Sequence, residues 1–563
     1  MTVQDFIQII LFLGILTILT PVLGNYMYKI FTGRRHFMVT VLGWPEKLIY
    51  RLTGIDPYEE TNWRVYTFNL IMFNLVGLLL LFAIQLLQSK LPLNPAGLPN
   101  VPWHSAFNTA VSFMTNTNWQ GYAGETTLSY LVQMTGLTVQ NYVSAATGIA
   151  VLLALIRGIS RRSTDMLGNF WTDLIRSILY ILLPLSILLA CILAGQGVVQ
   201  NFKEYETIHT LEGAGQVLPM GPAASQIAIK QLGTNGGGFF NANSSHPYEN
   251  PTPLTNFLEL LAILLIPAAL TYTFGKMVGS TRQGWTIFIV MLILFISGLA
   301  ISLFSEYSAH TIFGNIPLME GKETRVGITS SVLWSISTTS ASNGSVNAML
   351  DSFSPISGML AMINIMLGEV IFGGVGAGLY GMVIFIILTV FIAGLMVGRT
   401  PEYLGKKIES FEVKMAIVAI LVPNMVIQIF SAFASISVPG ISSLNNAGPH
   451  GLSEILYAYS SAAGNNGSAF AGLNANTLFY NLTLGLGMLA GRFGVIIPVL
   501  AIAGTMAKKK ITPESSGTFR TDNWLFVCLL IAVIIIIGGL AHFPALSLGP
   551  IVEHLLMNNG MTF

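Results

Sequence analysis

Residues 231–247 read Gln-Leu-Gly-Thr-Asn-Gly-Gly-Gly-Phe-Phe-Asn-Ala-Asn-Ser-Ser-His-Pro, a stretch rich in glycine and asparagine between long apolar segments. Its centre is the triplet Thr234-Asn235-Gly236. Related triplets recur at nearly constant intervals: Ser342-Asn343-Gly344, Asn465-Asn466-Gly467 and the degenerate Asn116-Thr117-Asn118. One Asn-Gly pair indicates only a turn. Several similar polar loops in one apolar chain suggest instead the walls of a single pore.

The composition is that of a membrane protein. Of 563 residues, 53% are hydrophobic and 9% are charged, whereas soluble domains carry roughly 25% charged residues. Many apolar runs reach the roughly 20 residues that span a bilayer. The net charge of +1 gives no reason to expect nucleic acid as a partner. We therefore predict an all-α polytopic membrane protein surrounded by membrane lipid.

Ten apolar segments are candidates for transmembrane helices. They cover 6–28, 65–88, 128–157, 172–198, 254–277, 284–304, 356–398 with an interruption, 413–436, 477–506 and 523–543. The polar loops follow the second, fourth, sixth and eighth. Each loop is preceded by a short segment, at 105–114, 223–232, 329–337 and 452–460. A helix of about ten residues rises only about 15 Å, so each segment must enter the membrane and leave on the same side.

The predicted unit is helix, half-helix, polar loop and helix, repeated four times around one pore with pseudo-four-fold symmetry. An N-terminal helix with a cytoplasmic loop precedes the four repeats, the third of which has an interrupted second helix, and a C-terminal helix with an extracytoplasmic tail follows. These parts cover 1–61, 62–165, 166–280, 281–405, 406–510 and 511–563. Most of the 26 basic residues lie in the loops on the side opposite the polar loops. Because basic loops face the cytoplasm, both termini and all polar loops are expected to face outward.

The polar loops have the chemistry of a site for a monovalent cation. Glycine and asparagine tolerate the left-handed conformations that aim backbone carbonyls inward, and a potassium-channel filter is built from such carbonyls. Each half-helix points the partly negative end of its dipole toward the pore. The triplets contain no carboxylate, which argues against calcium and magnesium.

Longer signatures accompany the triplets. They are Thr-Asn-Thr-Asn-Trp-Gln-Gly at 115–121, the stretch 231–247, Gly-Glu-Val-Ile-Phe-Gly-Gly-Val-Gly-Ala-Gly at 368–378, and Gly-Arg-Thr-Pro-Glu-Tyr-Leu-Gly-Lys-Lys-Ile-Glu at 398–409. With these, the chain resembles from end to end the potassium-binding A subunits of Kdp-type potassium-importing P-type ATPases. That family belongs to a superfamily of potassium transporters, which resemble potassium channels of four-fold symmetry folded into one chain.

The resemblance implies a potassium-binding subunit in a bacterial plasma (inner) membrane, with a P-type catalytic subunit and small accessory membrane subunits as partners. It implies a filter made of the four triplets. The inner ion ligands would be Asn116, Thr234, Ser342, Asn343 and Asn465, with the carbonyls of Gly236, Gly344 and Gly467. Gln120 would shape the filter mouth. Asn118 stands where the other triplets have glycine, so the first loop is expected to depart most from the shared carbonyl geometry.

The seventh apolar segment contains a glycine-rich break formed by Gly368, Gly373, Gly374, Gly376 and Gly378. Such a break is typical of unwound backbone that lines a cavity, although glycines also permit close contact between helices. The resemblance implies a barrier below the filter.

Two charged residues lie in apolar surroundings. Glu369, inside the break, is a functional candidate by default. It either attracts a cation that leaves the filter or pairs with a basic residue. Arg492, in the ninth segment, either repels the cation from a cytoplasmic exit or forms a salt bridge, for which Glu369 is a candidate. Both roles are compatible.

Nothing in the sequence provides for nucleotide hydrolysis. The chain contains no Gly-x-x-x-x-Gly-Lys-Ser/Thr loop, no Asp-Lys-Thr-Gly phosphorylation motif and no large soluble insertion. The eight histidines lack the spacing of metal ligands. We expect a non-catalytic chain whose ligand is the transported K⁺. The alternatives are a passive or ion-coupled potassium transporter of the same superfamily and, ranked lower, a secondary transporter with two inverted halves.

Smaller features are ambiguous. Cys191 and Cys528 lie in apolar runs, which predicts buried, unpaired thiols. The basic character of cytoplasmic loops is enough to explain the charges of Arg399, Lys406 and Lys407. Docking to a partner subunit is a weaker hypothesis for these residues.

Overall fold

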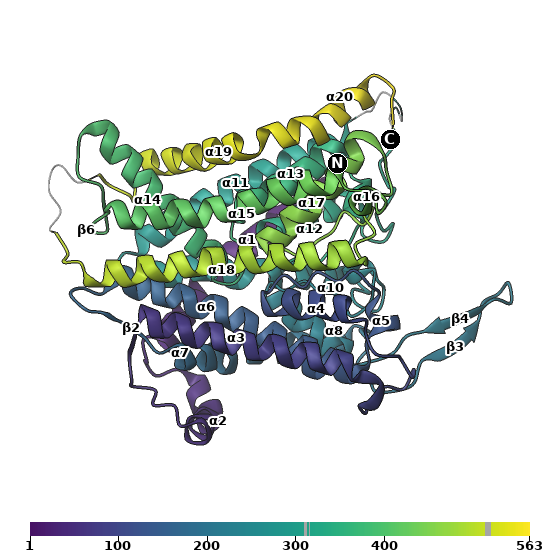
Figure 1. Cartoon of the computed structure of the whole chain (residues 1–563), viewed down its shortest axis with the longest axis horizontal. Coiled ribbons are helices and arrows are strands. Elements are labelled where there is room, and N and C mark those ends of the chain that lie inside the picture. Colours follow the sequence, from purple (N-terminus) through teal and green to yellow (C-terminus); the bar gives the residue numbers. More distant parts are fainter. Residues whose placement is uncertain (309–311, 313, 315, 513–518, 563) are drawn as a thin grey trace.

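Ten helical segments are long and apolar enough to cross a membrane in the computed structural model, which describes residues 1–308, 312, 314, 316–512 and 519–562. They lie roughly along the long axis of the molecule (Figure 1). The segments are α1 (Val3–Phe31), α3 (Trp63–Leu86), Val132–Ser160 with α6 (Val139–Ser160), Phe170–Gly195 with α7 (Phe170–Ser177) and α8 (Leu183–Gly195), α10 (Pro253–Met277), α11 (Thr281–Tyr307), α14 (Ala377–Val397), α15 (Ser410–Ile436), α18 (Leu478–Lys508) and Trp524–Asn558 with α19 (Trp524–Leu546) and α20 (Val552–Asn558). The expected number of spans is confirmed.

The helices divide into an inner and an outer set. In the spans that contain α6, α10, α14 and α18, between 61% and 83% of the most apolar 18-residue stretch is buried inside the protein. In the other six spans the buried share is 50% or less. The inner helices are those that follow the four polar loops, and they contact one another in the centre of the molecule. The outer helices leave long rows of apolar side chains exposed, as a surface that faces lipid requires.

Four shorter helices precede the polar loops. They are α4 (Trp103–Met114), α9 (Ala223–Leu232), α12 (Gly327–Ser340) and α17 (Gly448–Gly464). The first two match the expected segments closely. The other two begin earlier and end later than expected, because the residues on both sides of the expected segments continue the helix. α12 and α17 have 14 and 17 residues, respectively.

The interruption in the seventh segment is present. Helix α13 (Pro355–Met366) ends before α14 begins, and irregular backbone joins them. Gly368, Glu369, Phe372, Gly373 and Gly376 all have positive φ in this join, which no helix accommodates.

Several elements lie outside this pattern. The expected loop after α1 contains the 17-residue helix α2 (Phe37–Thr53), and the chain is helical as far as Asn558, beyond the expected end of the last span. The remaining α-helices and strands are α5 (Gly124–Thr127), α16 (Val438–Ile441) and three two-stranded ribbons, namely β1 (Thr61–Asn62) with β2 (Met166–Gly168), β3 (Glu206–His209) with β4 (Gly215–Leu218), and β5 (Glu402–Tyr403) with β6 (Lys406–Lys407). Both termini lie at the end of the molecule from which β3 and β4 project (Figure 1).

The prediction of buried cysteines is wrong. Cys191 in α8 and Cys528 in α19 are free and exposed. Both helices belong to spans that are less than half buried, so an apolar position there faces outward as readily as inward.

Candidate ion-binding site

The four polar loops share one backbone conformation. In each loop the residues on both sides of the middle residue have positive φ, from 49° at Thr234 to 95° at Gly467. The pairs are Asn116 and Asn118, Thr234 and Gly236, Ser342 and Gly344, and Asn465 and Gly467. Asn118, with φ of 57°, adopts the left-handed conformation of the glycines in the other loops. Non-glycine residues in this region cost roughly 1–3 kcal/mol each, so the surrounding structure must hold them in place.

Hydrogen bonds close the four loops into a ring. The Asn116 amide donates to the Thr234 carbonyl over 2.9 Å, joining the first loop to the second. The Asn343 amide donates to the carbonyl of Lys230 in α9 over 3.0 Å, joining the third to the second. The Ser342 hydroxyl donates to the Asn465 carbonyl (2.9 Å), and the Asn465 amide donates to Thr117 Oγ1 (3.0 Å). Each loop therefore contacts both of its neighbours.

The middle residue of each loop offers a buried carbonyl. Thr117, Asn235, Asn343 and Asn466 are all 0% exposed, and their carbonyl oxygens accept no hydrogen bond from any residue that the structure describes. A side chain at Gly236 would overlap the Asn343 carbonyl oxygen, and one at Gly344 would overlap that of Asn466. More than nine in ten buried carbonyls are paired. This shared exception is the arrangement that a desolvated cation requires.

Side chains behind the loops fix the ring. The Asn118 amide donates to Asn141 Oδ1 (2.6 Å), and the Ser144 hydroxyl donates to Asn116 Oδ1 (2.7 Å). Asn141 and Ser144 lie on α6 and were missed in the sequence. Their signal is a row of polar residues one turn apart, from Gln140 to Thr147, inside an apolar span. The Asn116 and Ser342 side chains, expected from the resemblance as ion ligands, are likewise engaged in bracing the ring.

A buried ion pair supports the second loop. Lys230 and Glu249 are both fully buried and are bonded to each other. Lys230 Nζ also donates to Asn243 Oδ1 over 2.9 Å, and the Asn243 amide donates to the Gly236 carbonyl over 2.7 Å. From the sequence, Lys230 could be recognised only as a basic residue on the outer side. No local feature of the sequence identifies Glu249 as its partner.

Gln120 joins two of the polar loops. Its side-chain oxygen accepts a hydrogen bond of 2.9 Å from the Gly238 amide, and its side-chain nitrogen is buried without a partner among the described residues. The side chain expected at the mouth thus links the first and second loops.

The break between α13 and α14 packs directly beneath the ring. The Val375 amide donates to Thr234 Oγ1 over 2.9 Å, and the Gly373 amide donates to the carbonyl of Ser340 at the end of α12 (2.9 Å). Gly376 is so close to Gly148 of α6 that a side chain at Gly376 would overlap the Gly148 carbonyl. The segment is therefore both unwound backbone and a close contact between elements.

A cavity of about 90 Å³ lies next to this segment. Its lining includes Ser342 and Asn465 of the ring, Gly368 and Glu369 of the break, and Arg492 of α18. This volume exceeds the roughly 10–15 Å³ that one water needs. The cavity also reaches residues of α15 and α19, so it extends sideways from the ring.

Glu369 and Arg492 share the cavity without pairing. The Glu369 carboxylate accepts a hydrogen bond of 2.7 Å from the Asn466 amide, which ties it to the fourth loop. Arg492 donates to the Ser144 carbonyl over 3.2 Å. Within the described part of the chain no ion pair joins the two, so the salt bridge considered for Arg492 and Glu369 is not formed.

Lys406 is fully buried. It donates to the carbonyl oxygens of Gly158, Arg161 and Met506, which lie at the carboxyl ends of α6 and α18. An ammonium group stabilises such helix ends. The docking hypothesis is therefore wrong for Lys406.

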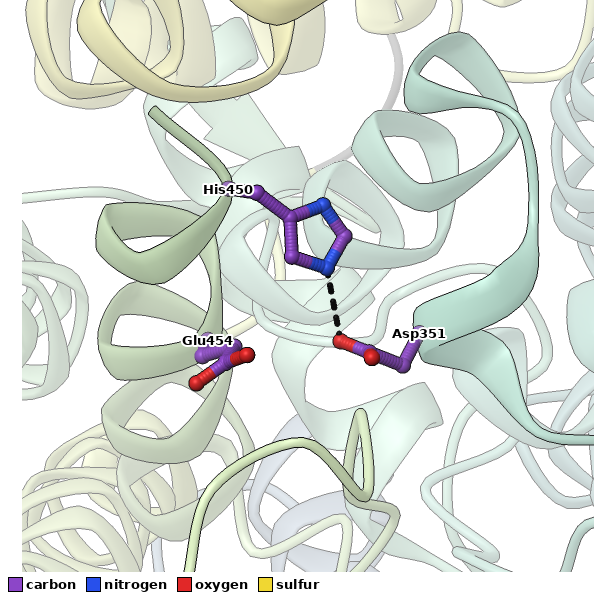
Figure 2. Close-up of side chains that lie close together, drawn as sticks. All are labelled: Asp351, His450 and Glu454. Carbon is purple, nitrogen blue, oxygen red and sulfur yellow. Dashed lines mark hydrogen bonds and ion pairs between the residues drawn. The ribbon is translucent and has the colours of Figure 1, made fainter. Parts of the chain in front are cut away.

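A separate cluster lies at the start of α17 (Figure 2). Asp351, His450 and Glu454 hold potential ligand atoms within 4.8 Å of one another. The two ring nitrogens of His450 are already bonded, Nε2 to Asp351 (2.8 Å) and Nδ1 to Glu553 (2.7 Å). Burial lowers the pKa of His450, but these two carboxylates outweigh it and raise the pKa to about 10. A metal ligand must be deprotonated, so the cluster fits an ion-pair network between α17 and α20 better than a metal site.

This network predicts a pH dependence of stability. The pKa of His450 is about 10 when folded, against an ordinary value of 6.5. The stabilisation is therefore complete below pH 6.5 and is lost as the pH rises toward 10. We expect the melting temperature of the purified chain to fall over this window, and to fall less in His450→Gln. Equal slopes for the two proteins would contradict a charged His450.

The fold and the ring define a class: a polytopic, almost entirely helical membrane protein in which four polar loops converge on carbonyls that no described residue pairs. Comparisons with known proteins agree with this class. The structure is similar to the crystal structure of the potassium transporter TrkH from Vibrio parahaemolyticus, with a TM-score of 0.53 and 14% sequence identity over 88% of this chain and 96% of that one. At this identity the similarity shows the fold alone.

The sequence comparisons are more specific. The family model described as potassium-transporting ATPase A subunit (KdpA) matches residues 10–555, so the chain belongs to that family. It is 59% identical to the potassium-transporting ATPase potassium-binding subunit of Rhodospirillum centenum, over 100% of this chain and 99% of the relative. The proteins of the same description from Sorangium cellulosum and Pseudomonas aeruginosa are each 55% identical, over 99% or more of every chain.

Proposed function

We propose that this chain binds and translocates potassium as the non-catalytic subunit of an ATP-driven, high-affinity importer in a bacterial inner membrane. The observation that carries the proposal is the set of four buried carbonyls of Thr117, Asn235, Asn343 and Asn466, which accept no hydrogen bond from the described part of the chain. They offer neutral oxygen ligands, which suit a weakly hydrated monovalent cation better than a divalent one. The family and the curated relatives support potassium as that cation and an ATPase as the assembly.

The finer architecture is part of the proposal. The four repeats, with the boundaries given from the sequence, surround one pore of pseudo-four-fold symmetry. Its mouth and both termini face outward, because the basic loops lie at the opposite end of the molecule. The four triplets then form the selectivity filter, and Gln120 lies at its entrance.

We assign the path below the filter from charge. Glu369 attracts a cation that leaves the ring, and Arg492 repels it from a direct exit. The break from Gly368 to Gly378 blocks straight passage, and the ion moves sideways through the cavity toward a catalytic partner. Such a P-type partner, with small accessory subunits, would supply the nucleotide chemistry for which this sequence has no motif.

The complex purified through this chain tests the assignment. We expect ATP hydrolysis to co-purify and to require potassium at low concentration. A chain that conducts potassium alone, with no co-purifying hydrolysis, would instead establish a passive transporter. Potassium-independent hydrolysis would contradict the proposed role of this subunit.

Glu369→Gln tests the path separately from the filter. Its amide keeps the size of the carboxylate but removes the charge that attracts the ion. We expect potassium-stimulated turnover to fall by about tenfold, equivalent to about 1.4 kcal/mol, while the potassium affinity of the ring changes little. Glu204→Gln, on an exposed loop, is the matched control. Turnover equal to that of the control would exclude this role for Glu369.

A further inference from the structure

A groove unrelated to the filter lies between α1 and α2. It has a volume of about 620 Å³. In Figure 1, α2 lies at the edge of the molecule and runs across the direction of the long helices. The groove is lined by the apolar Val22, Phe37 and Val39, by the polar Asn25, Tyr26 and Thr40, and by the basic or titratable Lys29, Arg35 and His36.

The apolar wall of the groove continues onto surfaces that face lipid. The side chains of Val22 and Phe37 are 64% and 68% exposed, and that of Ile18, one turn before Val22, is 68% exposed. On α2 the exposed apolar side chains include Val41 and Trp44. An amphipathic helix with this composition lies in the plane of the membrane interface. The groove is therefore at the depth of lipid headgroups, with acyl chains able to follow the outer face of α1.

The charged side of the groove is positive and uncompensated. Lys29 and Arg35 are exposed, and within the described chain neither side chain pairs with a carboxylate. Among the residues that the structure describes, no acidic one lines the groove. The nearest carboxylate on α2, Glu46, is already paired with Arg176 over 2.8 Å. The imidazole Nδ1 of His36 is buried and has no partner among the described residues.

The groove is held open by contacts behind it. The Tyr26 hydroxyl donates to the Tyr180 carbonyl over 2.8 Å, and the His36 ring packs edge-on against Tyr180 with ring centres 4.7 Å apart. Glu46 also accepts a hydrogen bond of 2.9 Å from Tyr50 and contacts Arg176, so α2 is fixed against α7. A ligand would find its binding surface already formed, which reduces the entropy cost of binding.

We propose that this groove binds the phosphate headgroup of an anionic phospholipid. Lys29 and Arg35 hold the phosphate, and Val22, Phe37 and Val39 contact the glycerol and upper acyl segments. Basic pockets beside transmembrane helices recognise anionic lipids in this way. A free phosphate would use only the cations and leave the apolar wall uncovered, so lipid is the source that the whole groove fits.

Native mass spectrometry of the full chain, with its accompanying subunits and titrated dioleoyl-phosphatidylglycerol, tests the proposal. We expect saturable binding that weakens by about tenfold or more in the double variant Lys29→Gln, Arg35→Gln, because each basic residue near an anionic lipid contributes appreciably. The matched control is Lys47→Gln, Arg51→Gln, which removes two exposed charges of α2 outside the groove. This control should retain wild-type affinity.

Three outcomes would overturn the proposal. Equal weakening in both double variants would mean that net charge alone attracts the lipid. Equal binding of dioleoyl-phosphatidylcholine would exclude recognition of anionic headgroups. Displacement of phosphatidylglycerol by millimolar inorganic phosphate would make the groove a site for the free anion.

Discussion

Gly236→Ala is expected to weaken potassium binding by roughly 100-fold. Gly236 has φ of 77°, and an added methyl group would overlap the Asn343 carbonyl oxygen and the Ser345 amide. The ring must then open or the second loop must withdraw from it. Backbone strain of about 1–3 kcal/mol, added to a displaced ligand, corresponds to about two factors of ten in affinity. Isothermal titration of the purified protein with potassium measures the change.

A second glycine provides the control for this substitution. Gly279, between α10 and α11, has φ of 81°, and nothing lies within 4 Å of an added side chain. Gly279→Ala therefore imposes similar backbone strain without touching the ring, and its potassium affinity should stay within about twofold of wild type. Equal loss in both variants would attribute the effect to folding rather than to the filter.

Lys230→Met is expected to destabilise the protein by about 3–5 kcal/mol, because it leaves the fully buried Glu249 without its cation. The substitution also removes the donor that holds Asn243, which in turn holds the Gly236 carbonyl. Thermal unfolding in detergent, followed with and without potassium, should show a lower melting temperature and a smaller stabilisation by potassium.

Two further variants test whether the expected destabilisation comes from leaving Glu249 buried without its partner or from removing any lysine charge. Lys230→Met combined with Glu249→Met removes both charges and should recover much of the stability. Lys508→Met breaks an exposed pair with Asp165, whose atoms are 3.0 Å apart and whose side chains are 57% and 56% exposed. Such pairs contribute at most about 1 kcal/mol. A Lys230→Met effect no larger than that of Lys508→Met would contradict the importance of the buried pair.

The parts of the fold that depend on local composition could be predicted. A span needs about 20 apolar residues wherever it lies, so the ten helices and the break before α14 follow from the sequence. The triplets around Asn235 and Asn343 were also detectable, because glycine and asparagine are required where φ is positive. Missed elements have weaker local signals. Helix α2 contains Gly43 and Pro45, which interrupt its pattern.

The supporting contacts of the site could not be predicted, because they depend on which residues meet across the fold. Ser144 braces Asn116 of the first loop, and Lys230 reaches Glu249 on the far side of the second loop. The side chain of Asn116 offers oxygen and nitrogen atoms whether it binds an ion or a neighbouring loop. Only its contacts in the folded structure distinguish these roles.

The central claim is that one potassium ion binds among the carbonyls of the four loops. Anomalous scattering from crystals of the protein soaked with thallium(I), a substitute for potassium, locates that ion directly. The account predicts a peak among the carbonyl oxygens of Thr117, Asn235, Asn343 and Asn466, and its loss in Gly236→Ala. A peak elsewhere in the protein, with none at the ring, would contradict it.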